Sequence, residues 1–200
     1  MKHLFERYGI HILSVITACT TVYALLNWNS ISTLQQLVFL FAIALTLHEW
    51  EEMHYPGGFV EMIVSKLKLP LQDLNTPKLI LFLVTVFIAF VPLFFPNVAW
   101  LAMAPLLVGV VEAIAHTAAT RMNPSGRFYS PGMVTALVCM LPVSIYGIYF
   151  IVSNGLMQPI EWLYSLLYLF VPLIVAQATI VRSTGMKYSE FLKNARNALS

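Results

Sequence analysis

Residues 37–52 read LVFLFAIALTLHEWEE, an apolar run that ends in a cluster of histidine and carboxylates. Only 10% of the 200 residues are charged and 59% are hydrophobic, whereas soluble domains carry about 25% charged residues. Long apolar runs with few charges are typical of helices that cross a membrane. The composition therefore predicts an all-α integral membrane protein, and it raises the question of why scarce charge is concentrated after Leu47.

Six apolar segments are long enough to cross the roughly 30 Å hydrocarbon core of a bilayer at about 1.5 Å per residue. The predicted spans are 9–26, 33–50, 78–95, 97–121, 132–153 and 160–181. After the second span, Pro56–Gly58 ends the helix, and residues 59–69 then place apolar side chains at helical spacing, which predicts a short interfacial helix. We expect a polytopic six-helix transmembrane bundle plus this helix, in one domain over residues 1–200.

The basic residues predict the orientation of these spans. All eleven Lys and Arg residues precede the first span, follow the sixth, or lie in the second-to-third and fourth-to-fifth connections. Positive charge marks the cytoplasmic side, so we expect a multi-pass protein of the inner (plasma) membrane with both termini in the cytoplasm. Because topology explains these charges, they do not indicate a nucleic-acid partner. The expected surroundings are membrane lipids, and the sequence does not determine an oligomeric state.

The second and fourth predicted spans run in the same direction and bring ionisable residues to one depth. His48 and Glu112 lie equally far from the starts of their spans, roughly 22 Å along each helix axis. Their side chains can therefore meet near the cytoplasmic edge of the hydrocarbon. Glu49 projects about 100° away from His48 around the helix, so it is left out of the predicted site.

Helical spacing groups the ionisable residues on two faces. His48, Glu51 and Glu52 have i, i+3 and i+4 spacing, and Glu112 and His116 have i and i+4 spacing. Two imidazoles and three carboxylates suit one or two divalent transition-metal ions such as Zn, Fe or Mn. Helical bundles build two-metal sites from similar inward-facing Glu and His residues. The predicted metal ligands are His48, Glu51, Glu52, Glu112 and His116.

A structure without metal is the alternative interpretation of this cluster. Ionised carboxylates at that depth cost several kcal/mol each unless a cation accompanies them. Glu51 and Glu52 would then be solvated among lipid headgroups. Glu112 would be protonated and would share a hydrogen bond with His116.

The stretch RFYSPGMV, residues 127–134, opens the fifth predicted span. Proline is favoured at the first position of a helix, which places the helix start close to Pro131. Tyr129 would then lie at the cytoplasmic rim beside the predicted site. Its hydroxyl could orient a ligand or donate a proton, and the alternative is an ordinary aromatic-belt residue.

Three motifs in this order resemble the HXXEE membrane proteins, an uncharacterised bacterial and archaeal family. They are H-x-x-E-E at residues 48–52, a further histidine at His116, and Y-x-P-G at residues 129–132. The resemblance supplies no activity. At the position four residues before the second histidine, where this family often has Asn, the chain has Glu112. The resemblance implies a shared site formed by His48, Glu51, Glu52, His116 and Tyr129.

The first functional hypothesis is a membrane metalloenzyme that acts on a lipid or other hydrophobic small molecule at the cytoplasmic leaflet. The metal would activate water, or, if it is iron, act on oxygen. Glu51 would be a bridging ligand or general base, and Tyr129 a second catalytic group. Arg121 and Arg127 could hold a phosphate headgroup, although the positive-inside rule is the better explanation for them.

Three alternatives stay open. A metal-free site of Glu and His could act as the acid–base pair of a membrane isomerase or cyclase. The cluster could instead bind an ion or proton in a transport protein, or lock helices together in an accessory subunit. Metal analysis of the purified protein separates the first hypothesis from these alternatives.

Overall fold

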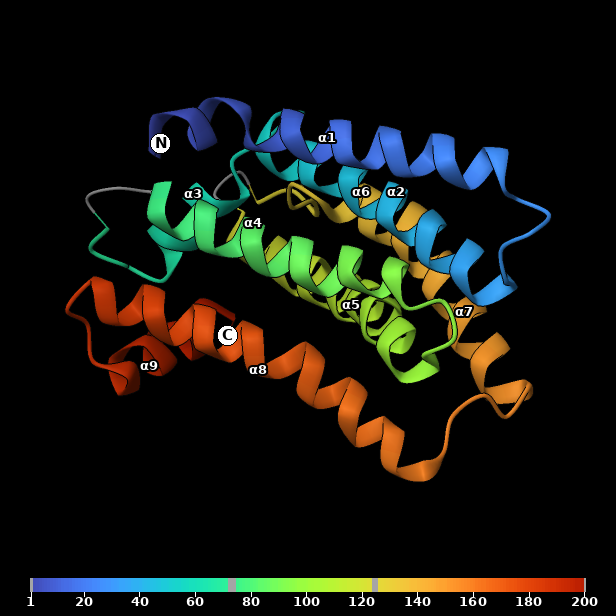
Figure 1. The fold of residues 1–200 in the computed structure, drawn as a ribbon. Helices are drawn as coiled ribbons and strands as arrows, with labels where there is room; N and C mark the ends of the chain where they lie inside the picture. Colours follow the sequence, from blue (N-terminus) through green and yellow to red (C-terminus); the bar gives the residue numbers. More distant parts are fainter. Residues whose placement is uncertain (1, 72–74, 124–125, 200) are drawn as a thin grey trace.

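The computed structural model describes residues 2–71, 75–123 and 126–199, which form an all-helical bundle (Figure 1). The helices are α1 (Lys2–Leu26), α2 (Thr33–Met53), α3 (Phe59–Lys66), α4 (Asn75–Phe90), α5 (Ala99–Ala119), α6 (Met133–Thr135), α7 (Leu141–Ser153), α8 (Pro159–Ser183) and α9 (Tyr188–Leu199). The 3-10 segments η1 (Val91–Phe94) and η2 (Thr120–Met122) extend α4 and α5, and the π-helical segment η3 (Ala136–Met140) joins α6 to α7.

Five helical segments in the described part of the chain are long and apolar enough to cross a membrane. They are Tyr8–Leu26, Thr76–Phe94, Ala99–Met122, Met133–Ser153 and Pro159–Ser183. Each coincides with a predicted span. The helix α2 is not among them, because glutamines near its start and the polar cluster at its end lower its mean hydropathy. Composition therefore supports a membrane bundle without establishing the predicted count of six.

The helices run roughly side by side, and their connections alternate between two ends of the bundle (Figure 1). The α1–α2, α4–α5 and α7–α8 connections lie at one end, and α3 and α9 lie at the other together with the start of α1. Half of the α5 span is buried inside the bundle, against 22% of the α8 span. The helix α5 is therefore central, and α8 is peripheral.

Polar contacts and a glycine fix how the inner helices pack. Trp50 Nε1 on α2 donates to Ser14 Oγ on α1 over 2.8 Å. On α5, a Cβ atom at Gly109 would overlap Ser144 Oγ on α7 and approach the Phe41 ring of α2. Small residues allow close helix approach where apolar surroundings give little hydrophobic drive for association. Gly109 thus sets the spacing of the three helices around the site.

Some helices extend beyond or stop short of the predicted segments, and one helix was not predicted. The helix α1 begins at Lys2 and not at residue 9, since charged residues stop a membrane span without stopping a helix. The interfacial segment ends at Lys66 and not at 69, because Lys68 has a φ of 55°. The helix α9 was not predicted; its Phe191 packs against Leu67 and Val181.

Candidate functional site

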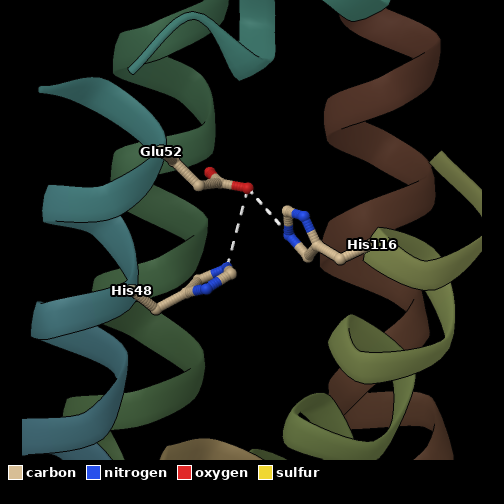
Figure 2. A group of neighbouring side chains, drawn as sticks. All are labelled: His48, Glu52 and His116. Atoms are coloured by element: carbon tan, nitrogen blue, oxygen red, sulfur yellow. Dashed lines mark ion pairs between the residues drawn. The ribbon is translucent and has the colours of Figure 1, made fainter. Parts of the chain in front are cut away.

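Two imidazoles and a carboxylate converge between α2 and α5 (Figure 2). One ligand atom from each of His48, Glu52 and His116 lies within 4.8 Å of the others. Glu52 Oε1 lies 3.6 Å from His48 Nε2 and 3.0 Å from His116 Nε2. His48 and Glu52 stand one turn apart on α2, and His116 projects from α5 toward them. Both imidazoles are buried.

A second carboxylate completes the cluster. Glu112 lies one turn before His116 on α5, and its Oε2 atom is 3.4 Å from His116 Nε2. The same oxygen lies 4.0 Å from His48 Nε2. Four of the five predicted ligands therefore meet at one point. We call His48, Glu52, Glu112 and His116 the ligand group.

Hydrogen bonds fix the direction in which each imidazole points. His48 Nδ1 lies 3.0 Å from the carbonyl oxygen of Gly132, which can only accept. Ser130 Oγ donates to the His116 carbonyl oxygen over 2.8 Å and can therefore accept from His116 Nδ1 at 3.2 Å. Both rings then carry a proton on Nδ1, and both Nε2 atoms face the carboxylates, where each can hold a lone pair or a second proton. Histidines that bind metals have this arrangement, with the outer nitrogen bonded to a carbonyl or hydroxyl group.

The Nε2 atom of His116 is buried and makes no hydrogen bond. Its 3.0 Å approach to Glu52 is an ion-pair distance, but the directions do not meet hydrogen-bond geometry. A buried nitrogen lone pair facing carboxylate oxygens is unfavourable unless a cation or a proton lies between them. Two imidazoles and two carboxylates are a donor set that fits a divalent transition-metal ion.

The turn at residues 129–132 packs directly against the ligand group. Gly132 has a φ of +96°, a conformation that favours glycine. A Cβ atom there would lie 2.5 Å from His116 Cε1, 2.8 Å from His48 Cε1 and 2.9 Å from Glu52 Cγ. The glycine of the Y-x-P-G motif therefore has a physical reason: only a residue without a side chain fits beneath the imidazoles.

Glu51 lies outside the ligand group, although it was predicted to be a ligand. Its Oε1 atom accepts from Tyr129 OH at 2.9 Å and from Val134 N at 3.2 Å. Its Oε2 atom accepts from Thr135 N at 2.8 Å and from Thr135 Oγ1 at 2.6 Å. The carboxylate thus caps the first turn of α6 from a neighbouring helix, with both oxygens occupied by donors.

Tyr129 faces Glu51 and not the ligand group. Partial burial raises the pKa of the Tyr129 phenol, and the bond to the Glu51 carboxylate raises it further. The phenol therefore stays protonated and keeps donating at neutral pH. Neither Glu51 nor Tyr129 lines the cavity that adjoins the ligand group. In the structure these two predicted catalytic residues contact each other, and their contact positions the turn.

A cavity of about 500 Å³ adjoins the ligand group. Its polar wall includes His48, Glu52, Glu112 and Glu49, and its other polar lining residues are Lys78, Thr85 and Gln177. Glu49, which helical geometry excluded from the predicted site, is buried and accepts from Thr85 Oγ1 on α4 at 3.3 Å. The cavity reaches around α2, so a residue 100° from His48 still contributes to its wall. The sequence signal that could have identified Glu49 was its position as an acidic residue inside an apolar span.

Two hydroxyl residues that orient the site were also missed. Ser130 accepts from His116, and Thr135 Oγ1 lies 3.2 Å from His48 Nδ1 while donating to Glu51. Both flank or occupy the Y-x-P-G motif, which was the one sequence signal pointing to them. Pairing each hydroxyl with its histidine requires the packing of α2 and α5 against the turn.

Comparison with known proteins identifies the family. The family described as "Protein of unknown function with HXXEE motif" matches residues 39–147, more than half of the chain. The match contains every residue of the ligand group and of the turn. No curated protein and no solved structure matches the chain. With its H-x-x-E-E helix, second histidine and Y-x-P-G turn gathered into one site, the chain belongs to the HXXEE-motif family of unknown function.

Proposed function

We propose that this chain is a membrane metalloenzyme that acts on a lipid or other hydrophobic substrate at the cytoplasmic leaflet. In this proposal α2 is a sixth span beside the five apolar segments, α3 lies in the interface, and both termini are cytoplasmic. The helix α2 has 21 residues, enough for roughly 30 Å at about 1.5 Å per residue. All basic residues then stay on one side, as the positive-inside rule requires.

The single observation that carries the metal proposal is the buried Nε2 atom of His116, which makes no hydrogen bond although it lies 3.0 Å from Glu52 Oε1 and 3.4 Å from Glu112 Oε2. The outer nitrogens of both imidazoles are already engaged by the turn. His48, Glu52 and His116 would hold one Zn, Fe or Mn ion, and Glu112 is close enough to join them. Bound there, a divalent ion would supply Lewis-acid or redox chemistry.

The chain's own residues have three tasks in this proposal. Gly132 and Ser130 hold the imidazoles by their outer nitrogens, and Glu51 holds the turn that carries both. The apolar walls of the cavity exclude water and position a hydrocarbon portion of the substrate. The carboxylates at one end accept hydrogen bonds from its polar portion.

A metal-free acid–base enzyme is the second candidate. It is favoured by the 3.0 Å separation of His116 Nε2 from Glu52 Oε1, which a proton on Nε2 could bridge as an ion pair. Such a site could protonate an alkene and stabilise the cation that follows, as an isomerase or cyclase requires. The two candidates differ in whether purified protein retains a metal.

The test measures bound metal and melting temperature together. Wild type, Glu52→Gln and His116→Ala are purified in one detergent, with Glu190→Gln, an exposed glutamate of α9, as the matched control. The metalloenzyme predicts about one transition-metal ion per chain in the wild type and the control. Both site variants should lose it and melt at lower temperature, because binding free energy contributes to folding.

The opposite outcome is equally specific. If wild type holds no metal after exposure to Zn, Fe and Mn salts, and Glu52→Gln melts at or above wild type, removal of the carboxylate has relieved repulsion between like charges. That pattern would reject the metalloenzyme and favour the acid–base candidate.

A further inference from the structure

The cavity beside the ligand group has one polar end and long apolar walls. It lies among α2, α4, α5 and α8, and residues of α3 and α9 close the end near the interfacial helices. Apart from the four ionisable residues of its polar wall, its lining is mostly aliphatic and aromatic. This shape suits an amphiphilic molecule with its polar group against the carboxylates.

The mouth of the cavity lies between α4 and α8. Leu81 on α4 and Ile174 on α8 both line the cavity and are 37% and 56% exposed, which we take to mark its opening. Phe170, one turn before Ile174, is also a lining residue and is 41% exposed. Farther along the same two helices, Tyr168 OH donates to Phe87 O over 2.6 Å and holds them together. The opening is therefore lateral, between apolar helix faces.

Charge at the polar end disfavours an anionic ligand. Glu49, Glu52 and Glu112 supply three carboxyl groups to this lining, and a single divalent ion balances the charge of two carboxylates. Lys78 is the one Lys or Arg among the described residues that line the cavity, and its Nζ lies 2.6 Å from Glu61 Oε1. A phosphate or carboxylate would find no unpaired Lys or Arg side chain among the described residues of this lining. Carboxylates are acceptors, and the group that they recognise is a hydrogen-bond donor.

The volume limits the size of the ligand. At roughly 30 Å³ per heavy atom, the share of volume that one water molecule occupies in the liquid, the cavity of about 500 Å³ has room for one hydrocarbon chain. A lipid with two such chains would leave one of them outside. The volume also falls in the range of roughly 300–1,000 Å³ that is usual for small-molecule sites.

We infer that the cavity binds a single-chain amphiphile whose polar end is an uncharged or cationic hydrogen-bond donor, a hydroxyl or an ammonium group, and that it enters between α4 and α8. This inference rests on the proposed function, because it takes the ligand group as the place where the substrate's polar end is held. It deepens that proposal by naming the substrate class.

Equilibrium binding to the purified full-length protein in nanodiscs tests the class. Tritiated hexadecanol and tritiated hexadecylamine are the probes, and unlabelled hexadecanoate and dihexadecanoyl phosphatidylcholine are the competitors. We expect saturable binding of at least one probe, close to one per chain. Hexadecanoate should compete about tenfold or more less well than the unlabelled probe, and the two-chain lipid should not compete. Equal competition by hexadecanoate, or effective competition by the two-chain lipid, would overturn the inference.

The entrance is tested by widening a side chain at the mouth. Ile174→Trp and Leu81→Trp should each weaken probe binding at least tenfold. Ile145→Trp is the matched control, because Ile145 is 58% exposed on α7 and does not line the cavity. Melting temperatures near that of wild type confirm that the variants are folded. Two entrance variants are tested in case one of them does not fold. Unchanged binding in folded variants would reject the α4–α8 entrance.

Metal content is measured on the same preparations, so that the two proposals can fail separately. Stoichiometric metal without saturable binding of either probe overturns the substrate inference and leaves the metalloenzyme standing. Saturable, donor-selective binding in protein without metal supports the substrate class and rejects the metalloenzyme. Chelator-treated protein is included as a third preparation. Loss of metal alone should leave probe binding detectable, because the apolar walls still hold the hydrocarbon chain.

Discussion

At the scale of single residues, the ligand group was predictable, and the residues that orient it were not. The i, i+4 spacings on two spans of equal depth were enough to bring His48, Glu52, Glu112 and His116 together in the prediction. Glu51 lies on the same helix face as His48, so spacing alone predicted that its carboxylate would join the same cluster. Its four donors come from residues 129–135, which helical periodicity cannot place. A catalytic role for Glu51 or Tyr129 stays a prediction.

The first residue-scale prediction concerns Gly132. We expect Gly132→Ala to reduce metal content and lower the melting temperature, because its Cβ would collide with both imidazoles. The positive φ alone costs roughly 1–2 kcal/mol for a residue other than glycine. Gly155→Ala is the control, since Gly155 has a φ of +58° and nothing within 4 Å of its Cβ position. A control that is as damaging as Gly132→Ala would mean that backbone strain, and not the collision, is responsible.

The second residue-scale prediction concerns Glu51. In Glu51→Gln the new side-chain NH₂ group must face a hydroxyl or a backbone N–H donor. A buried donor left without an acceptor lowers the stability of the fold by about 1–3 kcal/mol. We expect metal affinity to fall about 10–100-fold, as is usual when a group supporting a ligand is lost. Metal titration and thermal melting measure both effects.

A companion variant separates positioning from ligation. Thr135→Val removes the hydroxyl that contacts both Glu51 and His48 without touching a predicted ligand. A positioning role predicts similar losses in Glu51→Gln and Thr135→Val, and a double variant no worse than either. If Thr135→Val binds metal normally while Glu51→Gln does not, Glu51 is a ligand after all.

At the scale of elements, hydropathy located the helices, but it did not distinguish their roles. The short helix α3 was predicted from apolar spacing, and the structure adds what holds it. Glu61 pairs with Lys78 on α4 over 2.6 Å, and the Phe59 ring lies 4.5 Å from the His116 ring. The helix α9 was not predicted, because the prediction was based on apolar spans and α9 is a polar segment. Its Phe191 and Ala195 are spaced i and i+4 and pack in one apolar cluster, a signal that was available.

A pH-dependence follows from the Glu61–Lys78 pair. Partial burial acts to raise the pKa of Glu61, but the hydrogen bond and charge of Lys78 outweigh it and hold that pKa below its ordinary value of 4.5. The pair's stabilisation is therefore fully present above pH 4.5 and is lost as the pH falls through the lowered pKa. Both side chains are substantially exposed, so the contribution at neutral pH is below about 1 kcal/mol.

The measurement compares wild type with Glu61→Gln. At pH 7 we expect the variant to melt slightly lower and to be cut faster by trypsin after Lys66, the last residue of α3. The difference in melting temperature should shrink toward zero in acid. Glu190→Gln serves as the control. A difference that persists undiminished well below pH 4.5 would mean that Glu61 stabilises α3 through something other than its charge.

At the scale of the whole molecule, composition alone predicted an all-helical bundle, and the structure agrees. Five segments have the length and hydropathy of membrane spans. The helix α2 falls short because glutamines near its start and the polar cluster at its end lower its mean hydropathy. A helix that carries a buried polar cluster is the element that hydropathy is least able to identify as a span, so the six-span prediction depends on orientation and not on composition.

Reporter fusions at the two termini test that orientation. We expect a cytoplasm-active reporter to give signal at both ends of the chain, and a reporter active only outside the membrane to give none. Fusions after residue 29 and after residue 156, in connections at the opposite end of the bundle, are the positive controls for outside activity. Opposite locations of the two termini would mean an odd number of spans, and α2 would then be the segment to exclude.

The order of the site along the chain has a consequence for how the protein matures. A ribosome delivers His48 and Glu52 first, then Glu112 and His116, and only afterwards Ser130 and Gly132. A nascent chain that ends within α5 thus owns every member of the ligand group, yet lacks both acceptors that orient the imidazoles. On the proposed function, ion capture is therefore a late event in biogenesis. It follows synthesis of the turn, and α8 and then α9 complete the cavity wall last.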